Sequence, residues 1–265
     1  MFLHGRQLVL LLMLLLYASA LCSLEPLPTC NPFLISAGGL TVLTDNPAAT
    51  YYNPAAGEGG ISTSASLPYG MSKLDQIELA SIVSYQNNSM YVGWQSLDSA
   101  DYKRQDMRFG IRFSQPGFRV GVGYKLLYDD IPGYGSEKDD RLAAGLRFKI
   151  QTLTLDLGSE HNLPFDKDNS FTAGDFRLNL SQQLEPTLLL GLGLQVSDQE
   201  IADFMVGCRL QLNPNLRGIA SWQSEPGRFG LGAVFNIKWF QLAYALQTHP
   251  ELAWTHSIGI TAMFP

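Results

Sequence analysis

The end of the chain alternates between apolar side chains and small or polar ones. Across residues 256–264 one face collects Ile258, Ile260, Ala262 and Phe264, and the other collects Ser257, Gly259, Thr261 and Met263. A repeat of two residues is the repeat of a β-strand, because successive side chains point to opposite faces of the sheet. The pattern therefore predicts a final strand with one apolar face that ends on an aromatic residue almost at the terminus.

Runs with the same period recur along most of the chain. We predict fourteen strands, at residues 61–69, 74–86, 88–98, 104–115, 117–129, 139–150, 152–161, 170–182, 185–197, 201–212, 215–224, 228–237, 239–248 and 254–264. An even number of strands, each apolar on one face and polar on the other, is typical of bacterial transmembrane barrels. A soluble β-sandwich is the alternative, since its strands alternate in the same way.

The connections between these strands also alternate in length. Tight ones are expected at 86–88, 114–117, 150–151, 212–215 and 237–238, and longer, charged ones notably at 129–141 and 160–170. Short turns on one side and longer loops on the other are characteristic of outer-membrane barrels, with the short turns on the periplasmic side. We therefore predict an all-β fold, a transmembrane antiparallel β-barrel of about fourteen strands that occupies residues 61–265.

The beginning of the chain predicts export. Arg6 precedes an apolar run at residues 8–16, and Ala18-Ser19-Ala20 provides small residues for cleavage, so residues 1–20 are expected to be a signal peptide. Export to an oxidising compartment allows Cys22 and Cys30 to pair. After this leader we find no apolar run of about 18 residues that could cross a bilayer as a helix.

Residues 21–60 show no sustained strand period and are rich in Pro, Ala and Asn. The Asn46-Pro47 and Asn53-Pro54 steps favour turns at the two ends of a short helical piece. A barrel of fourteen strands is wider than one of eight, which its own side chains fill, so it leaves room for a plug. We predict that residues 21–60 form this plug or hatch inside the lumen, with the turning points Asp45, Asn46, Pro47, Asn53, Pro54 and Ala55.

The order of motifs in this segment is familiar. An Ala-Gly-Gly run at residues 37–39, then Asp45-Asn46-Pro47-Ala48, then Tyr51-Tyr52-Asn53-Pro54-Ala55, resembles the N-terminal segment of the PorV/PorQ family within the FadL/OMPP1-like barrel superfamily. The likeness covers residues 37–57 and returns at residues 247–256. It implies an outer-membrane barrel with a luminal hatch. Two features depart from that pattern: the chain is short for the group, and Pro265 follows the terminal aromatic residue.

Basic side chains are expected on the lumen side of the barrel. By strand parity they are Lys125 and Lys149 together with the candidates Arg108, Arg112, Arg119, Arg147, Arg177 and Arg209. Acidic residues gather in the predicted loop at 129–140, which suggests a cationic lumen beneath an acidic rim. The basic residues could attract an anionic group such as a fatty-acid carboxylate. They could equally pair with the plug carboxylates Asp45 and Glu58, since barrel interiors are generally polar.

The sequence gives little support for catalysis. It contains no HExxH, Gly-x-Ser-x-Gly, Walker or Cys-x-x-Cys motif. We expect a protein that is not an enzyme and has no catalytic residue, metal site or cofactor. The net charge of -6 argues against nucleic acid, which requires a basic surface.

Three functions follow as hypotheses. By resemblance to PorV/PorQ, the protein would be an accessory or shuttle component of type IX-like protein secretion in the bacterial outer membrane. The alternatives are a FadL-like passive transporter of hydrophobic small molecules such as long-chain fatty acids, and a structural barrel of the envelope. The expected partners are outer-membrane lipid, the barrel-assembly machinery acting on the C-terminal strand, and either secretion-system proteins or a hydrophobic ligand.

Overall fold

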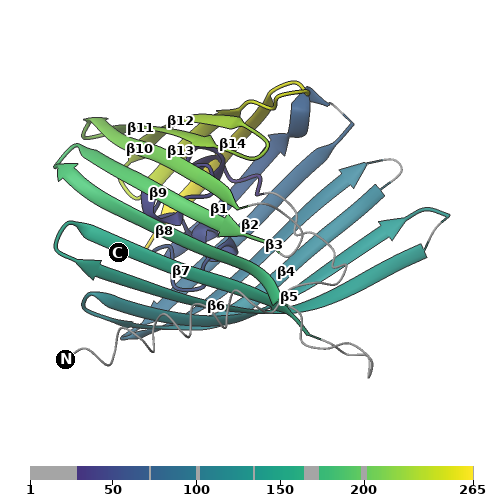
Figure 1. Cartoon of the computed structure of the whole chain (residues 1–265), viewed down its shortest axis with the longest axis horizontal. Coiled ribbons are helices and arrows are strands. Elements are labelled where there is room, and N and C mark those ends of the chain that lie inside the picture. The colour runs from purple at the N-terminus through teal and green to yellow at the C-terminus, as the bar shows by residue number, and fades with distance from the viewer. Residues whose placement is uncertain are drawn as a thin grey trace.

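The computed structural model describes residues 29–71, 73–99, 102–133, 135–163, 173–197 and 202–264. Within these ranges, fourteen antiparallel strands form one closed barrel around a helical N-terminal segment (Figure 1). The predicted fold class is therefore confirmed. The expected signal peptide and Cys22 lie outside the described residues.

The strands follow the order of the sequence around the barrel, so each one pairs with its neighbours along the chain. They are β1 (Gly60–Leu67), β2 (Asp75–Tyr85), β3 (Asn88–Ser99), β4 (Tyr102–Gln115), β5 (Phe118–Ile131), β6 (Gly135–Ile150), β7 (Leu153–Asn162), β8 (Ala173–Glu185), β9 (Leu188–Val196), β10 (Asp203–Asn213), β11 (Leu216–Gln223), β12 (Arg228–Ile237), β13 (Phe240–Gln247) and β14 (Thr255–Met263). The first and last strands close the ring over eight residue pairs, from Gly60 opposite Met263 to Leu67 opposite His256. Closure leaves no unpaired edge strand, as a bilayer requires.

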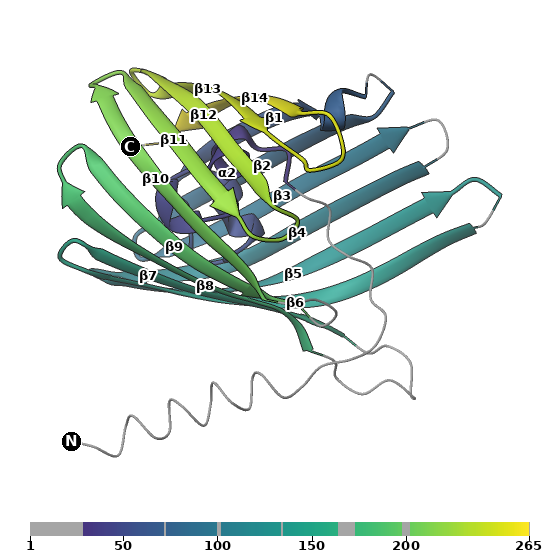
Figure 2. The ribbon, with the colours of Figure 1, turned by 45° about the horizontal axis from the view of Figure 1, so that its top comes forward.

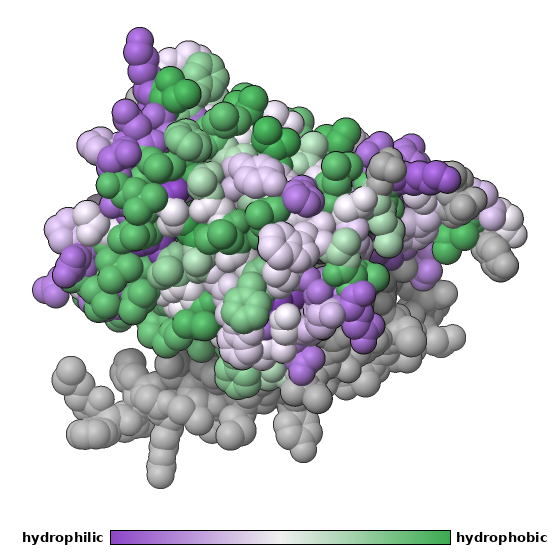
Figure 3. Space-filling model, turned by 90° about the horizontal axis from the view of Figure 1, so that it is seen from above, coloured by the Kyte–Doolittle hydropathy of each residue, from purple (hydrophilic) through white to green (hydrophobic). Residues whose placement is uncertain are grey.

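The two faces of the wall differ as the period of two predicts. Ile258 and Ile260 on β14 point outward and are about half exposed, while Ser257 and Thr261 point inward and are buried. On the face that carries β11–β14, hydrophobic residues gather between two hydrophilic ends (Figure 3). Cys208 also lies on the outward side of β10, between Val206 and Leu210. The outer surface therefore suits contact with hydrocarbon.

The wall is much taller on one side. Strands β4, β5 and β6 have 14, 14 and 16 residues, whereas β11, β13 and β14 have 8, 8 and 9. In Figure 2 the long strands extend well past the others at one end of the barrel. The prediction of a long charged loop at 129–141 was wrong, since β5 continues to Ile131 and β6 starts at Gly135. Inward Asp129 pairs with Arg104, and inward Arg141 pairs with Asp139 and Glu160, so these charges belong to strands.

The short connections all lie at the end of the barrel where β1 begins and β14 ends. Two-residue turns join β2 to β3, β4 to β5, β6 to β7, β8 to β9, β10 to β11 and β12 to β13. Gln86, Gln151 and Lys238 open three of them with a positive φ of 53° to 55°. Such left-handed residues match the twist of hairpin turns. We expect this end to face the periplasm, because short turns are periplasmic in outer-membrane barrels.

The segment before β1 lies inside the barrel and contains no strand among its described residues 29–59. It consists of helix α2 (Pro32–Ser36) and the short helical turns η1 (Thr41–Leu43) and η2 (Pro47–Tyr51). A further turn, η3 (Pro68–Gly70), follows β1 at the opposite end. The sequence predicted η2, which lies between the two expected Asn-Pro steps, but it did not predict α2. We call residues 29–59 the plug.

Candidate functional site

The plug is built on three Asn-Pro steps with the same local geometry. The side-chain oxygens of Asn31, Asn46 and Asn53 accept hydrogen bonds from the backbone N–H two residues later, at 3.1, 2.9 and 2.9 Å. Asn31 and Asn46 thereby cap α2 and η2, each with Pro at its first position. Asparagine is a preferred helix cap, and proline is well tolerated at that position. These steps make a compact plug from a segment without a sheet.

The same three asparagines also tie the plug to the barrel wall. Their side-chain nitrogens donate to Ser62 Oγ at 3.2 Å, Thr261 Oγ1 at 2.7 Å and the Leu146 carbonyl at 3.2 Å, in the order Asn31, Asn46, Asn53. One amide thus folds the plug with its oxygen and anchors it with its nitrogen. Sequence reasoning missed Asn31, although its Asn-Pro step repeats the pattern of the other two.

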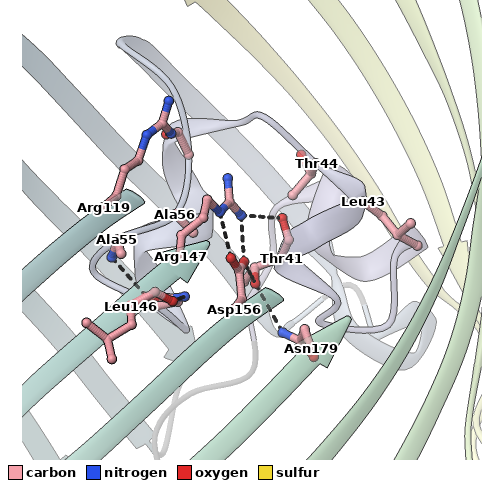
Figure 4. A network of polar contacts seen from close by, with 12 residues as sticks. Thr41, Leu43, Thr44, Ala55, Ala56, Arg119, Leu146, Arg147, Asp156 and Asn179 are labelled. Carbon is pink, nitrogen blue, oxygen red and sulfur yellow. Dashed lines mark hydrogen bonds and ion pairs between the residues drawn. The ribbon is translucent and has the colours of Figure 1, made fainter. Parts of the chain in front are cut away.

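Arg147 forms the centre of a polar network between wall and plug (Figure 4). Its guanidinium makes two hydrogen bonds to Asp156, both 2.6 Å long, and a third to the Thr41 carbonyl at 3.1 Å. The Thr41 hydroxyl donates to Asp156 at 2.6 Å and accepts from Asn179 at 3.1 Å. Two-pronged pairing of arginine with a carboxylate is both strong and directional. This network fixes η1 against β6, β7 and β8.

Three further arginines bind the part of the plug that lies towards the short turns. Arg112 donates to the carbonyls of Ala56 and Gly57 at 2.9 and 2.8 Å. Arg119 pairs with Glu58 at 2.8 Å, and Arg209 pairs with Asp45 at 3.2 Å. The structure thus places these predicted lumen-facing arginines on plug carbonyls and on the plug carboxylates that the sequence offered as partners.

Arg217 adds a weaker contact to Asp45 at 3.8 Å. Burial alone would raise the pKa of Asp45, but the charges of Arg209, Arg217 and Arg147 outweigh that effect and lower the pKa below its ordinary value. Asp45 therefore stays ionised at neutral pH.

Two adjacent tyrosines of the plug stack on two arginines of the wall. The Arg108 guanidinium lies 3.3 Å from the ring centre of Tyr51, and that of Arg177 lies 3.6 Å from the ring centre of Tyr52. The Tyr51 hydroxyl donates to Asp106 at 2.7 Å. Burial, and then the charge of Asp106, raises the pKa of Tyr51 well above its ordinary value, so the phenol keeps its proton. Cation–π contacts of this kind gain strength where water is excluded.

The wall also carries buried carboxylates that sequence reasoning did not select. Asp106, Asp156, Glu78 and Glu160 all point inward, and Glu160 pairs with Lys125 at 3.2 Å and Arg141 at 3.1 Å. Strand parity could have found them, since Asp156 and Glu160 share a face with Gly158. The lumen is therefore a mixed ionic lining, and not the cationic chamber beneath an acidic rim that we expected.

The opposite side of the plug is apolar. Phe33, Leu40, Val42 and Leu43 pack with wall residues of β9 to β13, which are Leu189, Met205, Ile219, Val234 and Ala243. Glycines allow this close approach. A Cβ added to Gly207 would come within 2.8 Å of Leu43, and one added to Gly230 within 2.5 Å of the Ile35 carbonyl. The plug therefore has one side held by polar contacts and another held by apolar packing.

Two cavities flank the plug. A small one of about 10 Å³, the size of one water molecule, lies beside Tyr51 and Tyr52 among the charged side chains Lys125, Glu160, Asp175 and Arg177. A larger one of about 400 Å³ lies at the end with the short turns, and plug residues Val42, Asp45 and Glu58 line it. The described residues contain no group of three His, Cys, Asp or Glu side chains that could hold a metal ion. In the same part of the chain, no helix has the length and apolar character needed to cross a bilayer.

Fold and interior together define a plugged fourteen-strand transmembrane barrel. No family model matches the chain, and neither does any curated protein. Among solved structures the fold is similar to a FadL homologue of Pseudomonas aeruginosa, with 11% sequence identity, a TM-score of 0.61, and coverage of 90% of this chain and 99% of that chain.

Two channels give comparable matches. The CymD monoaromatic hydrocarbon channel has 9% identity and a TM-score of 0.63, and the match covers 88% of this chain and 97% of that chain. A deltaS2 mutant of the TodX monoaromatic hydrocarbon channel has 9% identity and a TM-score of 0.59, with 83% and 95% covered. Identities this low show a common fold alone. The protein is thus a FadL-like barrel in fold, and both its location in the outer membrane and its link to PorV/PorQ stay predictions.

Proposed function

We propose that the protein is a gated passage for small hydrophobic molecules across the outer membrane, and that this structure is its closed form. The observation that carries the proposal is the two-sided attachment of the plug. One side is bound to β1–β8 through many polar contacts, whereas the other packs on β9–β13 mainly through apolar side chains, with Arg209 and Arg217 adding polar contacts to Asp45 there. Solved barrels of the same fold include two monoaromatic hydrocarbon channels, which supports a transport role.

The polar side is the side that can open. The contacts of Arg112 and Arg119 are hydrogen bonds and an ion pair that water replaces at modest cost, because each exchanged hydrogen bond is worth only about 0.5–1.5 kcal/mol net. Separating the apolar side would instead expose Leu40, Leu43 and Phe33 to water. We therefore expect the plug to stay docked on β9–β13 while a passage opens along β2–β8.

A reversible disulfide between plug and wall tests this function. A Cβ built on Gly158 lies 3.6 Å from Cβ of Asn53, within the usual separation of about 3.5–4.5 Å for a disulfide. The same Cβ lies 2.6 Å from the Tyr52 carbonyl oxygen, so the single Gly158→Cys variant also shows whether this contact alone moves the plug. Asn53→Cys with Gly158→Cys, in a background with Cys22, Cys30 and Cys208 changed to Ala, would fix the plug on its polar side. Toluene uptake is measured in bacteria that lack their own channels for hydrophobic compounds.

We expect the oxidised pair to block toluene uptake and a reductant to restore it. Each single cysteine variant serves as a control and should transport under both conditions. Deletion of residues 37–57 should raise the flux. Negligible uptake by the wild type and by the deletion variant alike would count against a transporter.

A second candidate is a non-catalytic accessory role in protein secretion, as the resemblance to PorV/PorQ implies. The close packing of the plug on the side away from the short turns favours this accessory role. On that side Tyr51 and Tyr52 leave a cavity of only about 10 Å³ among charged side chains. The test is loss of the gene in the native cell. Retention of an otherwise secreted protein, with unchanged toluene uptake, would favour this candidate over the passage.

A further inference from the structure

The larger cavity has the position and size of a ligand site. It lies between the plug and the periplasmic turns at 115–118 and 151–152, and its volume is about 400 Å³. Pockets for small molecules typically measure about 300–1,000 Å³. Because it lies at the periplasmic end, the cavity is accessible without any movement of the plug.

The lining has an excess of positive charge. Four cationic side chains, Arg119, Arg147, Lys149 and Arg209, face two carboxylates, Asp45 and Glu58. Asp45 is ionised at neutral pH, as its lowered pKa indicates. Because Asp156 also neutralises Arg147, the excess amounts to one charge. Partly enclosed cations with low-dielectric walls concentrate anions.

The four cationic side chains differ in how far they are already paired with carboxylates. Arg147 makes both of its short contacts to Asp156, and Arg119 and Arg209 each hold a plug carboxylate while their side chains stay 25% and 21% exposed. Lys149 is exposed and forms no ion pair within the described part of the chain. An exposed lysine in the same cavity as two partly exposed arginines offers donors for an added oxyanion.

One part of the same cavity is apolar. Val42 of the plug and Leu189 of β9 contribute to the lining. Val42 and Leu189 belong to the buried apolar cluster that holds the plug on that side. The remaining lining is uncharged and polar, with Thr152, Thr154 and Ser181 among it. The combination suits a ligand with a compact apolar body and one anionic group.

We propose that this cavity binds small aromatic carboxylates of about the size of benzoate, with the carboxylate near Lys149 and Arg119 and the ring near Val42 and Leu189. The inference rests on the proposed passage in one respect only: the cavity would be the last binding site that a ligand meets before it reaches the periplasm. It adds acidic aromatic compounds to the class of molecules that the barrel accepts.

Calorimetric titration of the full-length mature protein in detergent micelles tests the site. Benzoate is compared with benzyl alcohol, which has similar size and no charge, and each titration is corrected with protein-free micelles. We expect benzoate to bind at least about tenfold more tightly than benzyl alcohol, and high salt to weaken only benzoate. Equal affinities, or no benzoate binding, would overturn the proposal.

Charge variants locate the site. Lys149→Gln should weaken benzoate binding, and Lys149→Glu should weaken it by a further factor, about tenfold or more in total. Lys103→Glu is the matched control, since Lys103 is an exposed lysine on the outward face of β4 at the opposite end. Heat-modifiable migration on gels verifies that each variant forms the barrel. Benzoate affinity that is unchanged in Lys149→Glu, or lowered equally in Lys103→Glu, would refute the assignment.

The outcome separates this inference from the proposed function. Toluene uptake without selective benzoate binding would leave the passage intact and refute the site. Selective benzoate binding without any uptake would support the site and refute the passage. The two measurements are independent because titration reaches the cavity while the plug is closed.

Discussion

The side-chain nitrogen of Asn46 lies 2.7 Å from the Thr261 hydroxyl oxygen, across 215 positions of the chain. Thr261 in turn donates to Ser62 at 3.0 Å. Thr261 belongs to β14 and Ser62 to β1, so the Asn46 amide is linked through Thr261 to both strands that close the barrel, and Asn31 bonds to Ser62 as well. Docking of the plug and closure of the ring are thus coupled at this seam.

Cys30 reports when the plug leaves its place. Its thiol is fully buried against Ser64 and Glu78, and burial, followed by the charge of Glu78, raises its pKa well above the ordinary value. Since the thiolate is the reactive form, we expect maleimide to label Cys30 far more slowly than a denatured control. The rate is measured by mass spectrometry with Cys22 and Cys208 changed to Ala. Equally fast labelling of native and denatured protein would contradict the described position.

Replacement of Asn46 by Ala should loosen the plug. It removes a helix cap and leaves buried Thr261 without the donor of Asn46, which together cost about 2 kcal/mol. We expect Cys30 to be labelled about thirtyfold faster. Asn213→Ala is the control, because Asn213 makes the same Asn-Pro turn in an exposed hairpin, with its side chain accepting from Asn215 N at 2.9 Å. A similar acceleration in both variants would mean that the tether to Thr261 has no special role.

The Arg147–Asp156 pair should tolerate loss of both charges better than loss of one. Asp156 is 1% exposed, so Arg147→Gln leaves a buried carboxylate without its partner at a cost of about 3–5 kcal/mol. The double variant Arg147→Gln with Asp156→Asn removes both charges and should recover much of that loss. Denaturant midpoints, followed by the loss of heat-modifiable migration, measure the effect. A double variant that is less stable than Arg147→Gln would contradict this account.

Two glycines of the wall make room for residues 53–55 of the plug. A Cβ on Gly121 would lie 2.6 Å from the Pro54 carbonyl, and one on Gly145 would lie 2.0 Å from the Asn53 side-chain oxygen. Gly121→Val should therefore displace this segment while the barrel still forms, and Cys30 should be labelled faster. Gly218→Val is the control, because a Cβ there meets only Leu212 at 3.9 Å. Unchanged labelling in Gly121→Val would show that the close approach is not required.

Acid should weaken the ion pair between Asp45 of the plug and Arg209 of the wall. The pKa of Asp45 is lowered in the folded protein, so its contribution to stability is present above the ordinary value of about 3.9 and is lost as pH falls through the lowered value. Hydrogen exchange at residues 40–50, corrected for its intrinsic pH dependence, should accelerate as the pH falls below about 4. Asp45→Asn should exchange faster than wild type at neutral pH and show less acceleration in acid. Equal acid responses in the two proteins would assign the effect to other carboxylates.

Strand periodicity predicts much of this interior. The inward positions of Arg112, Arg147 and Arg209 follow from alternation alone. Even the Arg147–Asp156 pair can be predicted from the sequence, since the two residues are equally distant from the tight turn at 151–152 that joins β6 to β7. Local turn chemistry likewise explains why η2 lies between two Asn-Pro steps.

What the sequence did not reveal depends on distant contacts. Nothing near Tyr51 indicates that its ring stacks on Arg108, because that contact joins the plug to β4. The charged stretch 129–141 was mistaken for a loop, since Asp129 and Asp139 look solvated until Arg104 and Arg141 are placed opposite them. Helix α2 was missed because five residues are too few to show a helical period.

The unequal height of the wall determines which part of the barrel extends furthest beyond its apolar band. On the outward face of β4–β6 the last apolar side chains are Met107, Leu126 and Leu142, and beyond them come Gln105, Tyr128 and Asp140. The upper third of these three strands therefore extends beyond the apolar band, and its outward face carries both acidic residues, Asp130 and Asp140, and basic ones, Lys103 and Lys138. With the short turns on the periplasmic side, as we expect, antibodies and phages approaching from outside would meet this extension before any other described part of the molecule.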